Sequence, residues 1–438
     1  MDKFMAFMDK YIVPVAAKIG AQRHLVAVRD AFIAMIPITM VGALATLVNN
    51  LPFEGYKKLM ASIFGEGWTT LGGDIWWGSM ATMAVFLVIG VAYFLAKSYE
   101  EDGLQAGLIS ASVFFITIPQ VASIVADGSI VEEWGFMHYS YLGTTALFTA
   151  IILGLLTTEV FVRLSRIKQI TIKMPDGVPP AVARSFQKLI PGMFTIVIFA
   201  VLALLIRLIT NGEYLTDLIN AYLGTPLSNI ADSLGSTLFF TFIVHLLWIV
   251  GLHGSNIALP FTETILTKLG GENAALAQAG ATEGYNVLAG SFFDSFVYLG
   301  GSGMILGLII ALIIAGRRRK DMVALGGLPS LFNISEPVIF GLPIVLNPIF
   351  MIPFVLGPVL CSAIAYLAID FGLVAPIIVT KIPWVTPPII GGFMANGHWT
   401  GGALALVNLL VSIVIYLPFV IAAERIDARR EAEEAKQN

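Results

Sequence analysis

The stretch Leu189-Ile-Pro-Gly-Met-Phe-Thr-Ile-Val-Ile-Phe-Ala-Val-Leu-Ala-Leu-Leu-Ile206 carries no charge and is bounded by Lys188 and Arg207. A helix needs about 20 mostly apolar residues to cross the hydrocarbon core of a bilayer. Backbone polar groups find no water there, so a spanning segment must satisfy them within its own helix. The stretch therefore predicts a transmembrane helix that begins near Leu189.

Stretches of the same kind recur along the 438 residues. They lie between Asp30 and Glu54, Asp74 and Lys97, Asp102 and Asp127, Glu133 and Glu159, Asp232 and Glu263, and Asp294 and Arg317, and two longer ones run from Glu336 to Asp370 and from Lys381 to Glu424. The chain is 57% hydrophobic and only 12% charged, whereas a soluble domain is roughly 25% charged. We therefore expect an all-α integral membrane protein.

The charges and motifs of the chain argue against several other classes. The net charge is -4, and the longest basic run is Arg317-Arg-Arg-Lys320, which is too little for a nucleic-acid-binding surface. Cys361 is the only cysteine and lies in an apolar run, so one chain can form neither a disulfide nor a metal cluster. The sequence contains no Walker A motif. We expect no metal, no cofactor and no nucleic-acid partner.

Charge also predicts how the chain is divided and oriented. Residues 1–24 alternate charged and apolar groups, which favours an amphipathic helix in the membrane interface over a signal peptide. Lys and Arg gather before the first span, at 163–173 and in the tail, so these parts and both termini are expected in the cytoplasm. The expected parts are the interfacial helix 1–24, an N-terminal transmembrane domain 25–222, a C-terminal substrate domain 223–425 and a tail 426–438.

Three segments of the second half interrupt the apolar pattern. Residues 254–294 carry several charges, and residues 321–343 and 387–402 carry Pro, Gly and Asn. Irregular backbone at membrane depth is tolerated only where protein or a water-filled cavity surrounds it. Interrupted segments of this kind point to the binding site of a transporter. We expect the site in the second half and the scaffold in the first.

Ionisable groups within apolar segments are costly, so each is a candidate for function. Glu336 in Asn333-Ile-Ser-Glu-Pro is the sharpest candidate, because its polar neighbours exceed what a helix start needs. The alternative is a carboxylate favoured by the helix dipole. His253 lies at a Gly-Leu-His-Gly-Ser-Asn break where a helix is expected to end, so its ring can face a cavity. His245 and His398 either line that cavity or bond a neighbouring helix.

Two tryptophans of the second half are candidates for sugar binding. Aromatic faces stack on the apolar faces of sugar rings, and polar groups bind the hydroxyls. Trp248 and Trp384 lie near the polar breaks and are the candidates here. The alternative is an interfacial tryptophan, which applies above all to Trp76, Trp77 and Trp134.

These segments together resemble a known family. Gly251-Leu-His-Gly-Ser-Asn, Asn333-Ile-Ser-Glu-Pro-Val-Ile-Phe-Gly and Asn396-Gly-His-Trp-Thr-Gly-Gly are similar to the membrane-embedded IIC component of bacterial sugar phosphotransferase systems, of the lactose, cellobiose and diacetylchitobiose branch. The resemblance covers nearly the whole chain. It implies about ten spans with two re-entrant hairpins in the C-terminal half, a homodimer formed by the N-terminal half, and one sugar site per protomer in the bacterial cell membrane.

The resemblance also implies the roles of individual residues. Glu336 and His253 are expected to flank the 6-hydroxyl of the sugar as the catalytic pair. The substrate-binding residues implied are Asn333, Trp248, Trp384, His245, Asn256 and Gly143. The phosphoryl donor is a cysteine of a separate IIB protein that IIA recharges, and neither is expected to be fused here. The sugar is expected to be a β-1,4-linked glucose or N-acetylglucosamine disaccharide, cellobiose or N,N'-diacetylchitobiose.

An ion-coupled secondary transporter is the main alternative. It would share the interrupted helices and the embedded carboxylate but would release the sugar unmodified. A proton relay usually needs several embedded acids, whereas Glu336 is nearly alone in the middle of the chain. This favours phosphorylation during uptake.

Overall fold

The structure is a computed structural model that describes residues 10–11, 13–50, 54–126, 129–172, 186–316, 319–342, 344, 347 and 349–437. The chain is mostly helical over these residues and divides into two compact units. Unit 1 comprises Met1–Gly20, Ala43–Gly72 and Asn229–Asn438, and unit 2 comprises Ala21–Gly42 and Gly73–Ser228. The expected interfacial helix 1–24 lies partly outside the described residues; from Val13 onward it is two helices, α2 and α3, which begin at Val13 and Arg23.

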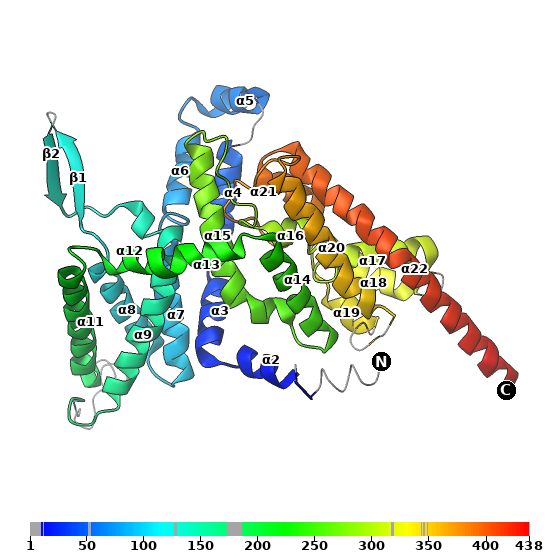
Figure 1. Cartoon of the computed structure of the whole chain (residues 1–438), viewed down its shortest axis with the longest axis horizontal. Helices are drawn as coiled ribbons and strands as arrows, with labels where there is room; N and C mark the ends of the chain where they lie inside the picture. The colour runs from blue at the N-terminus through cyan, green and yellow to red at the C-terminus, as the bar shows by residue number, and fades with distance from the viewer. Residues whose placement is uncertain are drawn as a thin grey trace. The chain divides into compact units, whose positions relative to one another are not determined.

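Unit 2 is a helical bundle with one hairpin (Figure 1). Its elements are α3 (Arg23–Ala34), α7 (Met83–Ser98), α8 (Gly103–Ile116), β1 (Val121–Ala126), β2 (Ser129–Trp134), η2 (Tyr139–Tyr141), η3 (Thr144–Ala146), α9 (Leu147–Ser165), α11 (Leu189–Ile209), α12 (Leu215–Ile219) and η4 (Asn220–Gly224). Small residues allow its helices to approach closely, as is usual in membrane proteins. A Cβ added at Gly154 of α9 would lie 3.0 Å from the Cβ of Val91 in α7.

The expectation of an all-α chain is wrong at the hairpin. Strands β1 and β2 pair antiparallel, with Val121 opposite Trp134 and Ala126 opposite Ser129. The Val-Ala-Ser-Ile-Val-Ala and Ser-Ile-Val-Glu-Glu-Trp segments are rich in β-branched residues, and Asp127-Gly128 lies between them in the sequence. An Asp-Gly dipeptide between such runs is a strong hairpin signal.

Unit 1 contains the interrupted segments. Its elements are α2 (Val13–Gly20), α5 (Glu54–Phe64), α14 (Leu234–Ile249), α15 (Gly254–Gln278), α16 (Phe292–Phe296), α17 (Ile305–Ala315), α18 (Lys320–Leu331), α19 (Glu336–Gly341), α20 (Met351–Asp370), α21 (Pro388–Asn396) and α22 (Trp399–Gln437). Helix α14 packs against α20, and α22 packs against α17 and α21. Helices α4 (Ile36–Asn50), α6 (Thr69–Trp77) and α13 (Thr225–Ala231) cross the boundaries between the units.

Two apolar clusters form the core of unit 1. One surrounds Trp248, Met304 and Phe354 between α14, α17 and α20. The other surrounds Phe292 and Ile377, where α16 lies against a non-helical segment of the chain. Residues of the interrupted segments belong to these clusters, as is expected of irregular backbone at membrane depth.

Among the described residues, four helices are long and apolar enough to cross a membrane. They are Tyr139–Ser165, Leu189–Ile209, Met351–Asp370 and Trp399–Ala428. Two further pairs of apolar helices are bent by 46° and 80° at a short break, and the number rises to six if each pair is counted as one span. The helix expected from Leu189 is confirmed as α11. The expected number of ten spans stays a prediction.

Candidate functional site

The site is built around the break between α14 and α15 in unit 1. Helix α14 ends at Ile249, and Gly251 has a φ of 79° that glycine adopts without strain. A Cβ on Gly254 would lie 1.9 Å from the backbone oxygen of Val244, so only glycine lets the next helix start this close to α14. The sequence predicted that a helix ends here, and this prediction is confirmed.

His253 caps the N-terminus of α15. Its Nδ1 accepts a hydrogen bond from the backbone N–H of Asn256 at 3.2 Å. A neutral imidazole whose Nδ1 accepts carries its proton on Nε2. The helix start therefore fixes which ring nitrogen is the donor.

That donor nitrogen faces the second candidate catalytic residue. His253 Nε2 lies 3.5 Å from Glu336 Oε1, and the two side chains are 39% and 44% exposed. A carboxylate oxygen can accept a hydrogen bond from this N–H, and the partial exposure of both side chains leaves them within reach of a ligand.

Trp248 lies behind this pair. Its ring centroid is 4.3 Å from that of His253 and 6.4 Å from that of Phe340 in α19. The indole is only 2% exposed. In this structure the Trp248 indole therefore packs on the His253 imidazole and helps to hold that ring in place. The two faces of the indole are themselves covered by protein.

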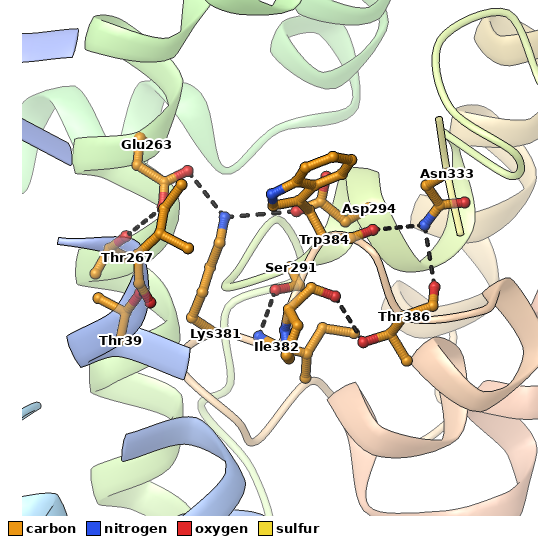
Figure 2. A network of polar contacts seen from close by, with 12 residues as sticks. Thr39, Glu263, Thr267, Ser291, Asp294, Asn333, Lys381, Ile382, Trp384 and Thr386 are labelled. Atoms are coloured by element: carbon orange, nitrogen blue, oxygen red, sulfur yellow. Dashed lines mark hydrogen bonds and ion pairs between the residues drawn. The ribbon is translucent and has the colours of Figure 1, made fainter. Parts of the chain in front are cut away.

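Asn333 joins three segments of unit 1. Its Oδ1 accepts the backbone N–H of Gly300 at 2.8 Å, and its Nδ2 donates to the carbonyls of Trp384 at 2.7 Å and Thr386 at 3.1 Å (Figure 2). The Trp384 side chain is 42% exposed. Asn333, which precedes Glu336 by three residues, thus fixes the backbone that carries the Trp384 indole.

The remaining candidates lie in different surroundings. His245 is fully buried in α14, with Nδ1 2.7 Å from the carbonyl oxygen of Thr241, and it packs against Tyr298 and Phe354. Asn256 is half-buried in the first turn of α15. Gly143 belongs to unit 2 and precedes η3.

One charged cluster of unit 1 was not predicted from the sequence. Lys381 forms ion pairs with Glu263 of α15 and Asp294 of α16 (Figure 2). A signal was available, because Lys381 is the only charged residue between Asp370 and Glu424 and a lysine in such a run needs acidic partners. Its partners lie far away in the sequence, so the spacing alone did not reveal them.

An apolar, mostly helical chain with an accessible ionisable pair at an interrupted helix has the features of a membrane transport protein. The chain belongs to the phosphotransferase system EIIC family of sugar transport components, whose model matches residues 29–358. Two bacterial relatives are each 37% identical to it over 425 residues: the lichenan permease IIC component of Bacillus subtilis and the cellobiose-specific EIIC component of Geobacillus stearothermophilus. The alignments cover 96% of this chain and 93% and 94% of the relatives.

A solved structure shares the fold. The transporter ChbC, the IIC component from the N,N'-diacetylchitobiose-specific phosphotransferase system, superposes with a TM-score of 0.92 at 34% identity. The match covers 97% of this chain and 99% of that one. The family expected from the sequence motifs is therefore confirmed.

Proposed function

We propose that the chain is the IIC permease for a β-linked disaccharide, either cellobiose or N,N'-diacetylchitobiose. It would move the sugar inward and present the 6-hydroxyl for phosphorylation. The names of the relatives support this substrate class, because they refer to lichenan, cellobiose and diacetylchitobiose.

The His253–Glu336 pair is the observation that carries the proposal. A carboxylate beside an imidazole Nε2–H offers one acceptor and one donor, which together match a hydroxyl group. In the proposed step the S–P bond of a phosphocysteine on IIB breaks and an O–P bond to the sugar forms. The hydroxyl proton passes to Glu336, and His253 orients the hydroxyl or stabilises charge on the phosphoryl group.

The other candidates supply binding. The exposed Trp384 is proposed as the stacking platform, and Trp248 as the ring that supports His253. Asn333 would use its remaining acceptor capacity for a hydroxyl, since three of its hydrogen bonds are already made. Asn256, His245 and Gly143 complete the proposed set.

The partners follow from membership of the phosphotransferase system. Phosphoryl groups would come from IIB and IIA proteins, because the only cysteine, Cys361, is buried in α20 and cannot serve as a donor. We further propose a homodimer through residues 25–222, a substrate domain at 223–425, ten spans with two re-entrant hairpins, and cytoplasmic termini.

The test is phosphoryl transfer in proteoliposomes with labelled disaccharides, phosphoenolpyruvate and the soluble phosphotransferase components. Wild type should accumulate the sugar 6-phosphate only with the complete relay. Glu336→Gln and His253→Ala should each lower the phosphorylation rate about 100-fold or more. Glu283→Gln, which changes an exposed carboxylate of unit 1, is the matched control and should behave as wild type. Accumulation of free sugar driven by an ion gradient would instead show a secondary transporter.

A further inference from the structure

A second charged cluster of unit 1 takes no part in the proposed chemistry. Lys381 Nζ lies 2.9 Å from Glu263 Oε2 and 3.4 Å from Asp294 Oδ2. The three side chains, called the Lys381 triad below, are 17%, 19% and 21% exposed respectively. Figure 2 shows the lysine side chain extended between the two carboxyl groups.

Stability alone is a poor explanation for such a cluster. The cost of desolvating half-buried charges largely cancels their attraction, and apolar side chains of similar size often stabilise as well. What an ion cluster adds is one defined geometry, because the partners must meet at specific positions. The Lys381 triad is therefore better explained by the part of the chain whose position it fixes.

The triad fixes the segment that carries Trp384. Residues 371–387 contain neither helix nor strand, so their position depends on contacts with other elements. Lys381 attaches the segment to α15 and α16, and the neighbouring N–H of Ile382 donates to Ser291 Oγ at 2.8 Å. Both contacts precede Trp384 by only a few residues.

Asn333 fixes the other side of the same segment, through the carbonyls of Trp384 and Thr386. The exposed indole is thus held between two anchors, the Lys381 triad before it and Asn333 at and after it. Through α15 the first anchor is continuous with His253, and through the 333–336 segment the second is continuous with Glu336. Together the two anchors therefore fix the position of the Trp384 indole relative to His253 and Glu336.

We propose that Lys381 is a positioning residue that acts through Trp384, setting the place of the indole relative to the His253–Glu336 pair. This rests on the proposed function, in which Trp384 stacks on the disaccharide. The triad contributes to substrate binding rather than to the phosphoryl transfer step, because it touches the segment of the binding residue and not the reacting groups.

The first test separates binding from chemistry. Lys381→Met, alone and together with Glu263→Gln and Asp294→Asn, is compared with Lys381→Arg in the phosphorylation assay. The triple variant leaves no unpaired buried charge, so it keeps the assay informative if the single variant folds poorly. The single Lys381→Met variant and the triple variant should each raise KM roughly tenfold and leave kcat within about twofold. Lys381→Arg, which keeps the positive charge, should have a KM much closer to that of wild type. A loss of kcat with KM unchanged would overturn the proposal.

A double-mutant cycle with Trp384→Ala tests whether Lys381 acts through the indole. In the Trp384→Ala background, neutralising the triad should change KM by less than about twofold. An equal effect in both backgrounds, or no effect of Trp384→Ala itself, contradicts the proposal.

A measurement without substrate keeps this inference separate from the proposed function. Amide hydrogen exchange of the peptide 380–387 should be roughly tenfold faster in the triple variant than in wild type, while peptides from α22 exchange equally. Unchanged exchange at 380–387 overturns the positioning role. If wild type phosphorylates none of the disaccharides but exchange rises as expected, the proposed function fails and the positioning role of Lys381 stands.

Discussion

His253 and Glu336 each begin a helix, and this position alone would suit a simple capping role. His253 accepts the N–H of Asn256, and Glu336 lies in the first turn of α19, where the helix dipole favours a carboxylate. Capping does not require the two side chains to meet, yet the donor nitrogen of one faces the carboxylate of the other at 3.5 Å. Such contacts are often long before substrate binds. Their convergence favours a functional pair over two independent caps.

Asn333 offers a test at the scale of one residue. It has a φ of 60°, which asparagine and glycine tolerate, and it makes three hydrogen bonds to backbone groups. Asn333→Gly keeps the backbone conformation and loses all three bonds, so it should lower the free energy of unfolding by about 2–3 kcal/mol. Asn333→Ala should cost about 1 kcal/mol more, because alanine is strained at this φ.

The measurement is thermal and SDS-induced unfolding in detergent micelles, with Asn211→Gly as the matched control. Asn211 has a nearly identical φ of 58° but lies exposed in a turn of unit 2. Its replacement should stay within about 0.5 kcal/mol of wild type. Equal effects of the two glycine variants would mean that the Asn333 hydrogen bonds contribute no stability.

The sequence predicted some of these residues and not others, for physical reasons. Glu336 and His253 could be found because an ionisable group in an apolar run is costly wherever the chain folds. The buried position of His245 could not be predicted, since it depends on Tyr298 and Phe354 from other elements. The ring tautomer of His253 and the partners of Lys381 likewise depend on tertiary contacts.

At the scale of elements, apolar runs and glycine- or proline-rich breaks in the sequence predicted where helices lie better than they predicted where a helix continues or is interrupted. The uncharged run at 189–206 became α11, and a break at 250–253 separates α14 from α15. The first part of the charged stretch 254–294 nevertheless forms one 25-residue helix, α15, in which Lys268 pairs with Glu272 and Glu263 pairs with Lys381. The hairpin was not predicted because β1 lies within the uncharged run between Asp102 and Asp127, which was expected to be helical, whereas most of β2 lies outside the uncharged runs.

The packing of α17 on α22 leads to a prediction for elements. A Cβ on Gly307 of α17 would lie 1.9 Å from Ser412 Oγ and 2.7 Å from Ser412 Cβ. Gly307→Ala should therefore force the helices apart and lower the free energy of unfolding by about 1–3 kcal/mol. Adding Ser412→Gly removes the clashing atoms and should recover part of this loss.

Gly327→Ala on α18 is the control for this experiment. Its added Cβ would meet nothing closer than 4.0 Å, so it should be neutral or slightly stabilising in the same unfolding assay. If Gly307→Ala is as mild as Gly327→Ala, the close approach of α17 and α22 is not needed for stability.

For the whole molecule, orientation in the membrane follows from where its charges lie. Lys and Arg at the interfaces are retained on the cytoplasmic side, whereas Asp and Glu have little influence. Arg163 in the last turn of α9 and Arg166 and Lys168 just after it are basic, while the hairpin segment 121–134 carries no Lys or Arg. These two regions lie on either side of α9, so they should face opposite sides of the membrane.

Single-cysteine labelling in intact cells tests this arrangement. Cys361 is buried and its Sγ lies 3.6 Å from the backbone oxygen of Asn408, so Cys361→Ser is a conservative background. Exposed positions then receive one cysteine each, as Glu133→Cys, Lys168→Cys and Arg425→Cys. An impermeant maleimide should label position 133 in intact cells, and positions 168 and 425 only after permeabilisation. Labelling of 168 from outside would reverse the orientation and put the proposed phosphorylation site out of reach of a cytoplasmic donor, so it would count against group translocation as well as topology.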